Sequence, residues 1–143
     1  MINRQIGPMA RKLNRYIKQN MNQMISDVTD NQVTAVQARI LFYLEWMNDQ
    51  EKKDVYQKDI ESFLSVSKST ASEMISTLEN NGFISRIKLE NDGRLRKIVL
   101  LEKGYETNKK VGETIKNFEQ SMKNKLSSKE LEVFFEIIEK LIN

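Results

Sequence analysis

The sequence predicts a mainly α-helical protein with one small two-stranded β-ribbon. Apolar residues recur at three- and four-residue spacing through most of the 143 residues, which is the periodicity of amphipathic helices. Only residues 84–100 change period, and Asp92-Gly93 there separates two apolar-rich arms, as in a β-hairpin. With one proline and five glycines the chain has few breaks, so we expect one domain or one small subunit of an oligomer.

The first two predicted helices differ in how much of their surface is apolar. Pro8 is tolerated in a first turn, and the residues after it predict a helix of about twenty residues with one apolar face. Thr34 and Gln37 have the spacing of a capping box and open a second helix. Apolar residues surround much of this second helix, so it should be central and buried. They are Ile40, Leu41, Tyr43, Leu44 and Met47.

A short helix, a turn and another capped helix come next. Residues 54–64 predict the short helix, with a residue or two of extended chain near its start. Ser67 is a favourable N-cap for the following helix. That helix should end at Gly82, which adopts the left-handed conformation easily, with Phe83 folding back over the last turn.

The ribbon is predicted to have an apolar face and a basic face. A two-residue turn at Asp92 and Gly93 would place Ile87 opposite Ile98 on the apolar face. Asp92 is expected to form the turn or to orient a nearby arginine. The opposite face would carry Arg86, Lys88 and Lys97, together with Glu90.

Helical periodicity resumes at Glu102 and predicts a long helix to about Lys125. Ser127 and Glu130 form a second capping box, which opens a final helix. This helix is too apolar to be left in water. Its apolar residues are Leu131, Phe134, Phe135, Ile137, Ile138, Leu141 and Ile142.

Composition argues against most enzyme classes. The chain has no cysteine and no histidine, so it has no thiol or imidazole nucleophile, no disulfide, no zinc site of the usual ligands and no Ser-His-Asp triad. It also has no phosphate-binding loop or dinucleotide fingerprint. We therefore expect no enzymatic activity, no cofactor and no metal.

Charge and hydropathy bear on location and partners. The longest apolar run, residues 40–44, is too short to span a bilayer, and no signal core follows the basic N-terminus, so we expect a cytoplasmic protein. The net charge is +3, and residues 84–100 carry five basic residues against two acidic ones. A basic stretch of this kind is compatible with nucleic-acid binding.

The order of elements is that of a helix-turn-helix followed by a wing. A capped helix with small polar residues on its exposed side suits a major groove, and a basic ribbon with Arg94 near its tip suits the adjacent minor groove. Base or phosphate contacts are expected from Ser69, Thr70, Ser72 and Ser76. Nonspecific attraction to phosphate is expected from Lys68, Arg86, Lys88 and Lys97.

Four motifs of the chain resemble the multiple antibiotic resistance regulator (MarR) family of winged-helix transcription factors. They are residues 67–72 (SKSTAS), 78–86 (LENNGFISR), 92–94 (DGR) and 98–104 (IVLLEKG). The resemblance implies a winged helix-turn-helix region over residues 34–101, with residues 68–77 as recognition helix and Arg94 as the wing-tip arginine. Residues 1–30 and 102–143 would form dimerisation helices.

The family resemblance also implies a function. It implies a homodimer that binds a pseudo-palindromic site on double-stranded DNA, more often as a repressor. A small aromatic or phenolic effector is expected, in a pocket that includes Phe42 and Trp46. The alternative is a winged-helix module that binds another protein, whose exposed recognition helix would carry large apolar residues.

Two residues depart from the family pattern. Leu101 replaces the usual threonine, so the cap of the following helix is lost or supplied elsewhere. Glu73 stands where many members have arginine, which removes a phosphate or guanine contact. We hypothesise that Glu73 accepts a hydrogen bond from a cytosine amino group.

Overall fold

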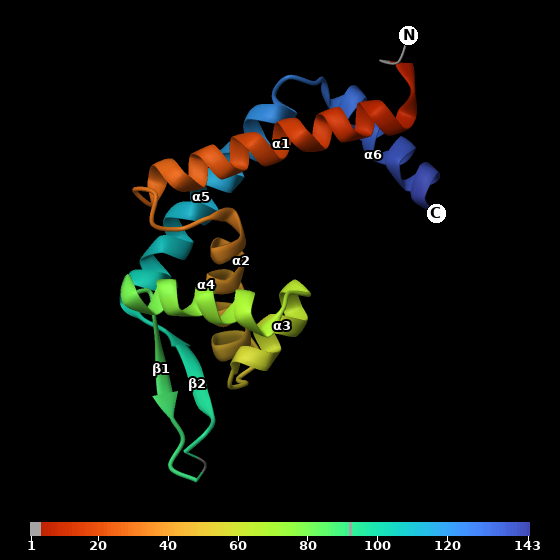
Figure 1. Cartoon of the computed structure of the whole chain (residues 1–143). Coiled ribbons are helices and arrows are strands. Elements are labelled where there is room, and N and C mark those ends of the chain that lie inside the picture. The colour runs from red at the N-terminus through yellow and green to blue at the C-terminus, as the bar shows by residue number, and fades with distance from the viewer. Residues whose placement is uncertain (1–3, 92) are drawn as a thin grey trace. The chain divides into compact units, whose positions relative to one another are not determined.

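The computed structural model describes residues 4–91 and 93–143. It is mainly helical with a two-stranded antiparallel ribbon, as predicted (Figure 1). In chain order the elements are α1 (Ile6–Val28), α2 (Ala35–Glu45), the π-helical turn η2 (Trp46–Gln50), α3 (Gln57–Leu64), α4 (Lys68–Asn80), β1 (Ile84–Lys88), β2 (Arg96–Leu100), α5 (Glu102–Lys123) and α6 (Ser128–Ile142).

The chain forms two compact units. The first spans Met1–Val111 and contains α1 to β2 with the first half of α5, and the second spans Gly112–Asn143. The helix-turn-helix and the ribbon thus lie within a single unit, where the ribbon follows directly after α4 (Figure 1).

Local sequence signals determine the helix ends. Thr34 Oγ1 accepts from Gln37 N at 3.1 Å while Gln37 Oε1 accepts from Thr34 N at 2.9 Å, so the predicted capping box is present. The same reciprocal pair joins Ser127 and Glu130 at the start of α6. At the end of α4, Gly82 has φ +81° and Phe83 N donates to Leu78 O at 3.0 Å, which stops the helix as predicted.

The core of the first unit forms around α2. Ile40, Leu41 and Leu44 of α2 are fully buried, which confirms its predicted central position. The buried faces of α3 and α4 supply Ile60 and Ile75. Leu78, Phe83, Ile84 and Ile98 complete this core and join the helix-turn-helix to the base of the ribbon.

The predicted register of the ribbon was wrong by one residue. Arg86, not Ile87, lies opposite Ile98, and Ile87 lies opposite Lys97. The reason is burial, because the observed register places Ile84, Ile98 and Leu100 on one face, where all three are buried. The predicted register would have separated Ile84 from the other two.

This correction also removes the predicted basic face. Arg86 and Lys88 share the buried-side face with Arg96, whereas Lys97 is on the other face beside Ile87. The last backbone hydrogen bond of the ribbon runs from Leu89 N to Leu95 O, so the connection is longer than a two-residue turn. The expected role of Asp92 lies outside the described residues.

The third helix begins later than predicted. It starts at Gln57 rather than at residue 54, because Val55 O accepts from Ile98 N at 2.7 Å and pairs its residue with β2. Asp59 Oδ2 then accepts from Tyr56 N at 2.8 Å and satisfies the start of α3. Val55, in the extended segment predicted here, therefore pairs with β2 through an isolated β-bridge.

The second unit leaves its apolar residues uncovered. No residue of α6 is buried, and Phe135, Ile137 and Leu141 are each about half exposed. Over residues 4–91 and 93–143, the structure has no helix with the length and hydrophobicity required to cross a membrane.

Candidate nucleic-acid interface

Helix α4 presents a small, polar, exposed face. Lys68, Ser69, Thr70 and Glu73 are exposed, and Ser72 and Ser76 are half-buried beside them. The opposite face is fixed by the fully buried Ala71, Ile75 and Leu78. The spacing of these apolar residues therefore determines which side chains of α4 reach solvent.

Hydroxyl groups at the start of α4 are already linked to one another. Ser67 Oγ accepts from Thr70 N at 3.2 Å and donates to Thr70 Oγ1 at 2.9 Å. The hydroxyl of Ser69 lies 3.2 Å from the same Ser67 oxygen. Ser69 and Thr70 are thus held in place at the positive end of the helix, where a phosphate would be favoured.

Arg86 of β1 is bound to Glu79 of α4. Its Nη2 and Nε donate to Glu79 Oε1 at 2.8 and 3.2 Å, and its backbone N donates to Glu79 Oε2 at 3.1 Å. Arg86 Nη2 also donates to Ser76 Oγ at 3.4 Å. Hydrogen bonds from Arg86 lower the pKa of Glu79, and partial burial opposes them only in part. The charged form of Glu79 is therefore favoured, and its contact with Arg86 joins the ribbon to α4.

This contact changes the role expected of Arg86. The charge of Arg86 is balanced by Glu79, so its main structural role is to hold β1 against α4 rather than to present a free cation. Sequence reasoning did not single out Glu79. Its signal was the spacing of Glu79 and Arg86 on either side of the helix stop at Gly82, which brings the two side chains to the same side of the turn.

A second contact fixes the end of α4. Lys103 Nζ of α5 donates to Asn81 O at 2.6 Å and lies 4.4 Å from the ring centroid of Phe83. A cation at the negative end of a helix is stabilising, and its position over an aromatic ring adds to this. Leu101 N donates to Phe83 O at 3.0 Å in the same region.

A basic groove lies between the start of α3 and the ribbon. Its volume is about 390 Å³, and its lining includes four cationic side chains against a single carboxylate, that of Asp59. The cations are Lys58, Arg86, Arg94 and Arg96. Lys58 and Arg96 were not predicted as site residues, and the wrong ribbon register had placed Arg96 on the apolar face.

The remaining predicted cations do not converge at this groove. Lys88 is exposed at the end of β1, and Lys97 is half-buried on the other face of the ribbon. Arg94 is exposed in the connection between the strands, within the basic groove's lining. Of the predicted wing residues, the structure thus brings Arg86 and Arg94 together.

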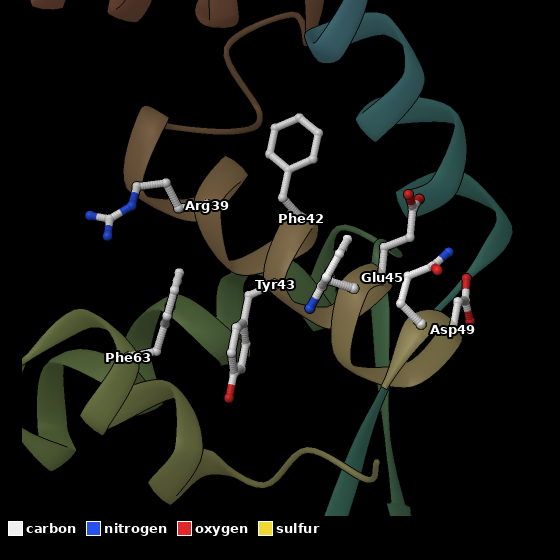
Figure 2. Close-up of a pocket in the computed structure, with 8 residues that line it drawn as sticks. Arg39, Phe42, Tyr43, Glu45, Asp49 and Phe63 are labelled. Carbon is white, nitrogen blue, oxygen red and sulfur yellow. The ribbon is translucent and has the colours of Figure 1, made fainter. Parts of the chain in front are cut away.

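An aromatic cavity forms beside α2. Its volume is about 620 Å³, and Phe42 and Trp46, the predicted effector residues, both line it. Tyr43 and Phe63 stack with their ring centroids 4.3 Å apart, and burial, with the charge of Asp59, raises the pKa of Tyr43. Figure 2 shows Arg39 beside Phe63 at one end, with Glu45 and Asp49 at the other.

The π-helical turn places part of this lining. Glu51 N donates to Trp46 O at 3.1 Å, one residue beyond an α-helical bond, so the turn widens at Trp46, Asp49 and Gln50. Such turns are often found at functional sites. Sequence periodicity did not predict this turn, because it had indicated a continuous α-helix through Met47.

These features define a winged-helix protein, and comparison with known proteins agrees. The MarR family model matches residues 33–95, which span the helix-turn-helix and β1 and end just before β2. Over these residues the chain is similar to the MarR family. No curated protein sequence matches the chain significantly.

Solved structures share the fold over nearly the whole chain. The crystal structure of MepR, a transcription regulator of the Staphylococcus aureus multidrug efflux pump MepA, has 21% identity and a TM-score of 0.84, over 96% of both chains. A MepR–DNA complex matches over 96% of both chains with 22% identity and a TM-score of 0.70. PcaV from Streptomyces coelicolor, in complex with its natural ligand, matches 99% of this chain and 94% of its own with 23% identity and a TM-score of 0.67.

Proposed function

We propose that the protein is a homodimeric regulator that binds a pseudo-palindromic site on double-stranded DNA. Residues 34–101 form the DNA-binding region, with α4 in the major groove and Arg94 in the flanking minor groove. Two copies of α4 lie in successive major grooves, about one helical turn apart. The expected outcome at a promoter is repression.

The observation that carries this proposal is the joining of α4 to the basic ribbon. The Glu79–Arg86 contact fixes the two elements that would enter neighbouring grooves, and the basic groove concentrates Arg94, Arg96 and Lys58 next to them. All of α4 lies within the described residues, and none of its large apolar side chains is exposed. This favours DNA over a protein as the partner of α4.

Dimerisation is supported by the apolar surface of the terminal helices. Exposure of the apolar residues of α6 to water is energetically unfavourable. Helix α1 also exposes Met9, Leu13 and Tyr16. A two-fold interface covers the same surface on both copies. We assign residues 1–30 and 102–143 to this interface.

The effector belongs in the aromatic cavity. The chemistry of its walls suits a small aromatic compound in contact with Phe42 and Trp46. Such a compound would release DNA only if it bound more tightly to a dimer whose two α4 helices are wrongly spaced for the duplex.

The test is titration of Arg94→Ala against a duplex that the protein selects from a random library. The affinity should fall, and the slope of log affinity against log salt should decrease by about one unit for each phosphate-type interaction that the substitution removes. Lys53→Ala, at an exposed lysine of the loop between η2 and α3, is the matched control and should leave both quantities unchanged. Equal behaviour of the two variants would remove Arg94 from the interface.

A further inference from the structure

The aromatic cavity beside α2 has a charge distribution that bears on what it binds. Its walls include four aromatic side chains: Phe42, Tyr43, Trp46 and Phe63. A volume of about 620 Å³ is within the range of small-molecule sites. Flat aromatic walls favour a planar ring system as the occupant.

One cation and two carboxylates also line the cavity. The guanidinium carbon of Arg39 lies 5.3 Å from the ring centroid of Phe63, so this cation is already placed over an aromatic face. Glu45 and Asp49 lie at the opposite end of the cavity (Figure 2). The net formal charge of the lining is therefore negative.

Within the described part of the chain, both carboxylates accept hydrogen bonds from uncharged side chains. Asp49 Oδ1 accepts from Tyr105 Oη at 3.0 Å, and Glu45 Oε1 accepts from Asn108 Nδ2 at 3.4 Å. Burial raises the pKa of Tyr105, and the hydrogen bond and negative charge of Asp49, with the charge of Glu45, raise it further. Among the described residues, no lysine or arginine forms a salt bridge with either carboxylate.

We infer that the cavity takes a planar aromatic cation, with its ring against Trp46 and its positive charge toward Glu45 and Asp49. Aromatic faces attract cations, and carboxylates attract them as well. An anion of the same shape would meet two like charges at that end. This inference rests on the proposed effector function, whose ligand class it narrows.

The same carboxylates connect the cavity to α5. Tyr105 and Asn108 lie on α5, and Asn108 Nδ2 also donates to Leu41 O at 2.9 Å. A cation that draws Asp49 and Glu45 toward itself competes with the bonds from these two α5 residues. Binding in the cavity thereby weakens hydrogen bonds made by α5, the helix that continues from the first unit into the second.

The test compares three probes of one shape and different charge in the absence of DNA. They are N-methylquinolinium, 4-methylquinoline, which is neutral at pH 8, and naphthalene-1-carboxylate. Calorimetric titration at pH 8 gives the affinities, and emission from Trp46, the only tryptophan, reports binding at the cavity. The cation should bind about tenfold tighter than the neutral probe, and the anion weakest.

Variants then locate the charge that selects the cation. Glu45→Gln with Asp49→Asn should lower the affinity for N-methylquinolinium about tenfold and leave that for 4-methylquinoline within twofold. Glu51→Gln, at an exposed glutamate outside the lining, is the matched control and should change neither.

Several results would overturn the inference. They are no binding by any probe, neutral or anionic probes that bind as tightly as the cation, unchanged cation affinity in the double variant, and binding that leaves Trp46 emission unaltered. Because no DNA is present, each of these outcomes is independent of the DNA-binding proposal, which the Arg94 titration tests separately.

Discussion

Replacing Glu79 by glutamine should uncouple the wing from the recognition helix. Glutamine keeps the size of the side chain and one oxygen acceptor, but it removes the charge that faces Arg86 Nη2 at 2.8 Å. The side chains of Arg86 and Glu79 are 26% and 32% exposed, so solvent screens the pair in part. We expect the free energy of unfolding to fall by about 0.5–1 kcal/mol, at the upper end of the range for exposed pairs and below that for hydrogen bonds to charged groups.

The effect on DNA binding is best read from a double-mutant cycle with Arg94. If Glu79 positions the wing, Arg94→Ala should cost less affinity in the Glu79→Gln background than in the wild type. A coupling free energy of about 0.7 kcal/mol corresponds to about a threefold smaller loss. Fluorescence anisotropy with a labelled duplex measures all four affinities.

A matched control separates positioning from simple charge. Removing any carboxylate near DNA raises affinity through long-range electrostatics, so Glu90→Gln, at an exposed glutamate next to the ribbon connection, measures that effect alone. It should show no coupling to Arg94. Additivity of Glu79→Gln and Arg94→Ala within about 0.3 kcal/mol would refute the positioning role.

The stability difference between wild type and Glu79→Gln also has a predicted pH dependence. The pKa of Glu79 is lower in the folded chain than its ordinary value of 4.5, so ionisation of Glu79 favours folding above that value. As the pH falls through the folded-state pKa, this contribution is lost. Urea unfolding should therefore show a difference at pH 7 that becomes smaller at pH 3.

Three further predictions concern packing, base preference and assembly. In urea unfolding, Gly104→Ala should lower the free energy of unfolding by about 1–3 kcal/mol, because the added Cβ would lie 2.6 Å from Phe83 O. The control Gly7→Ala, whose added Cβ would lie 4.0 Å from its nearest neighbour, should leave the free energy of unfolding unchanged or raise it. Selection from a random duplex library should show weaker preference for cytosine at one position with Glu73→Gln, by about fivefold or more; an unchanged preference would count against that contact. Ile138→Glu should convert a dimer to a monomer in light scattering, and a dimer that persists would exclude α6 from the interface.

Signals confined to a few neighbouring residues predicted the helix ends well. The capping box at Thr34 and Gln37 depends only on a spacing of three residues, and so does the N-cap at Ser67. The stop at Gly82 likewise depends on one backbone conformation that glycine adopts without strain. These features need no knowledge of the rest of the fold.

Features that depend on distant residues were predicted poorly. The ribbon register follows from which side chains the helical core can bury, and Ile84 was decisive although the Asp-Gly turn signal pointed to a different pairing. The start of α3 depends on pairing of Val55 with Ile98, more than forty residues away. Both errors arose because local propensity was overridden by tertiary packing.

In the candidate site too, features set by neighbouring residues were predicted and features set by distant residues were not. Exposure of Lys68 and Ser69 followed from the periodicity of α4, and the aromatic lining at Phe42 and Trp46 was expected from the family resemblance. The engagement of Arg86 by Glu79 was not expected, because a count of charges treats each cation as independent. Three-dimensional pairing decides which cations remain available to a partner.

The measurement that tests the central claim most directly is selection of duplexes by the purified protein from a random library, followed by sequencing and salt titration. The predicted result is enrichment of a pseudo-palindrome with half-sites about one helical turn apart, bound with an affinity that falls as salt rises. Failure to enrich any sequence, or binding that does not change with salt, would contradict the assignment of α4 and the wing as a DNA-binding surface.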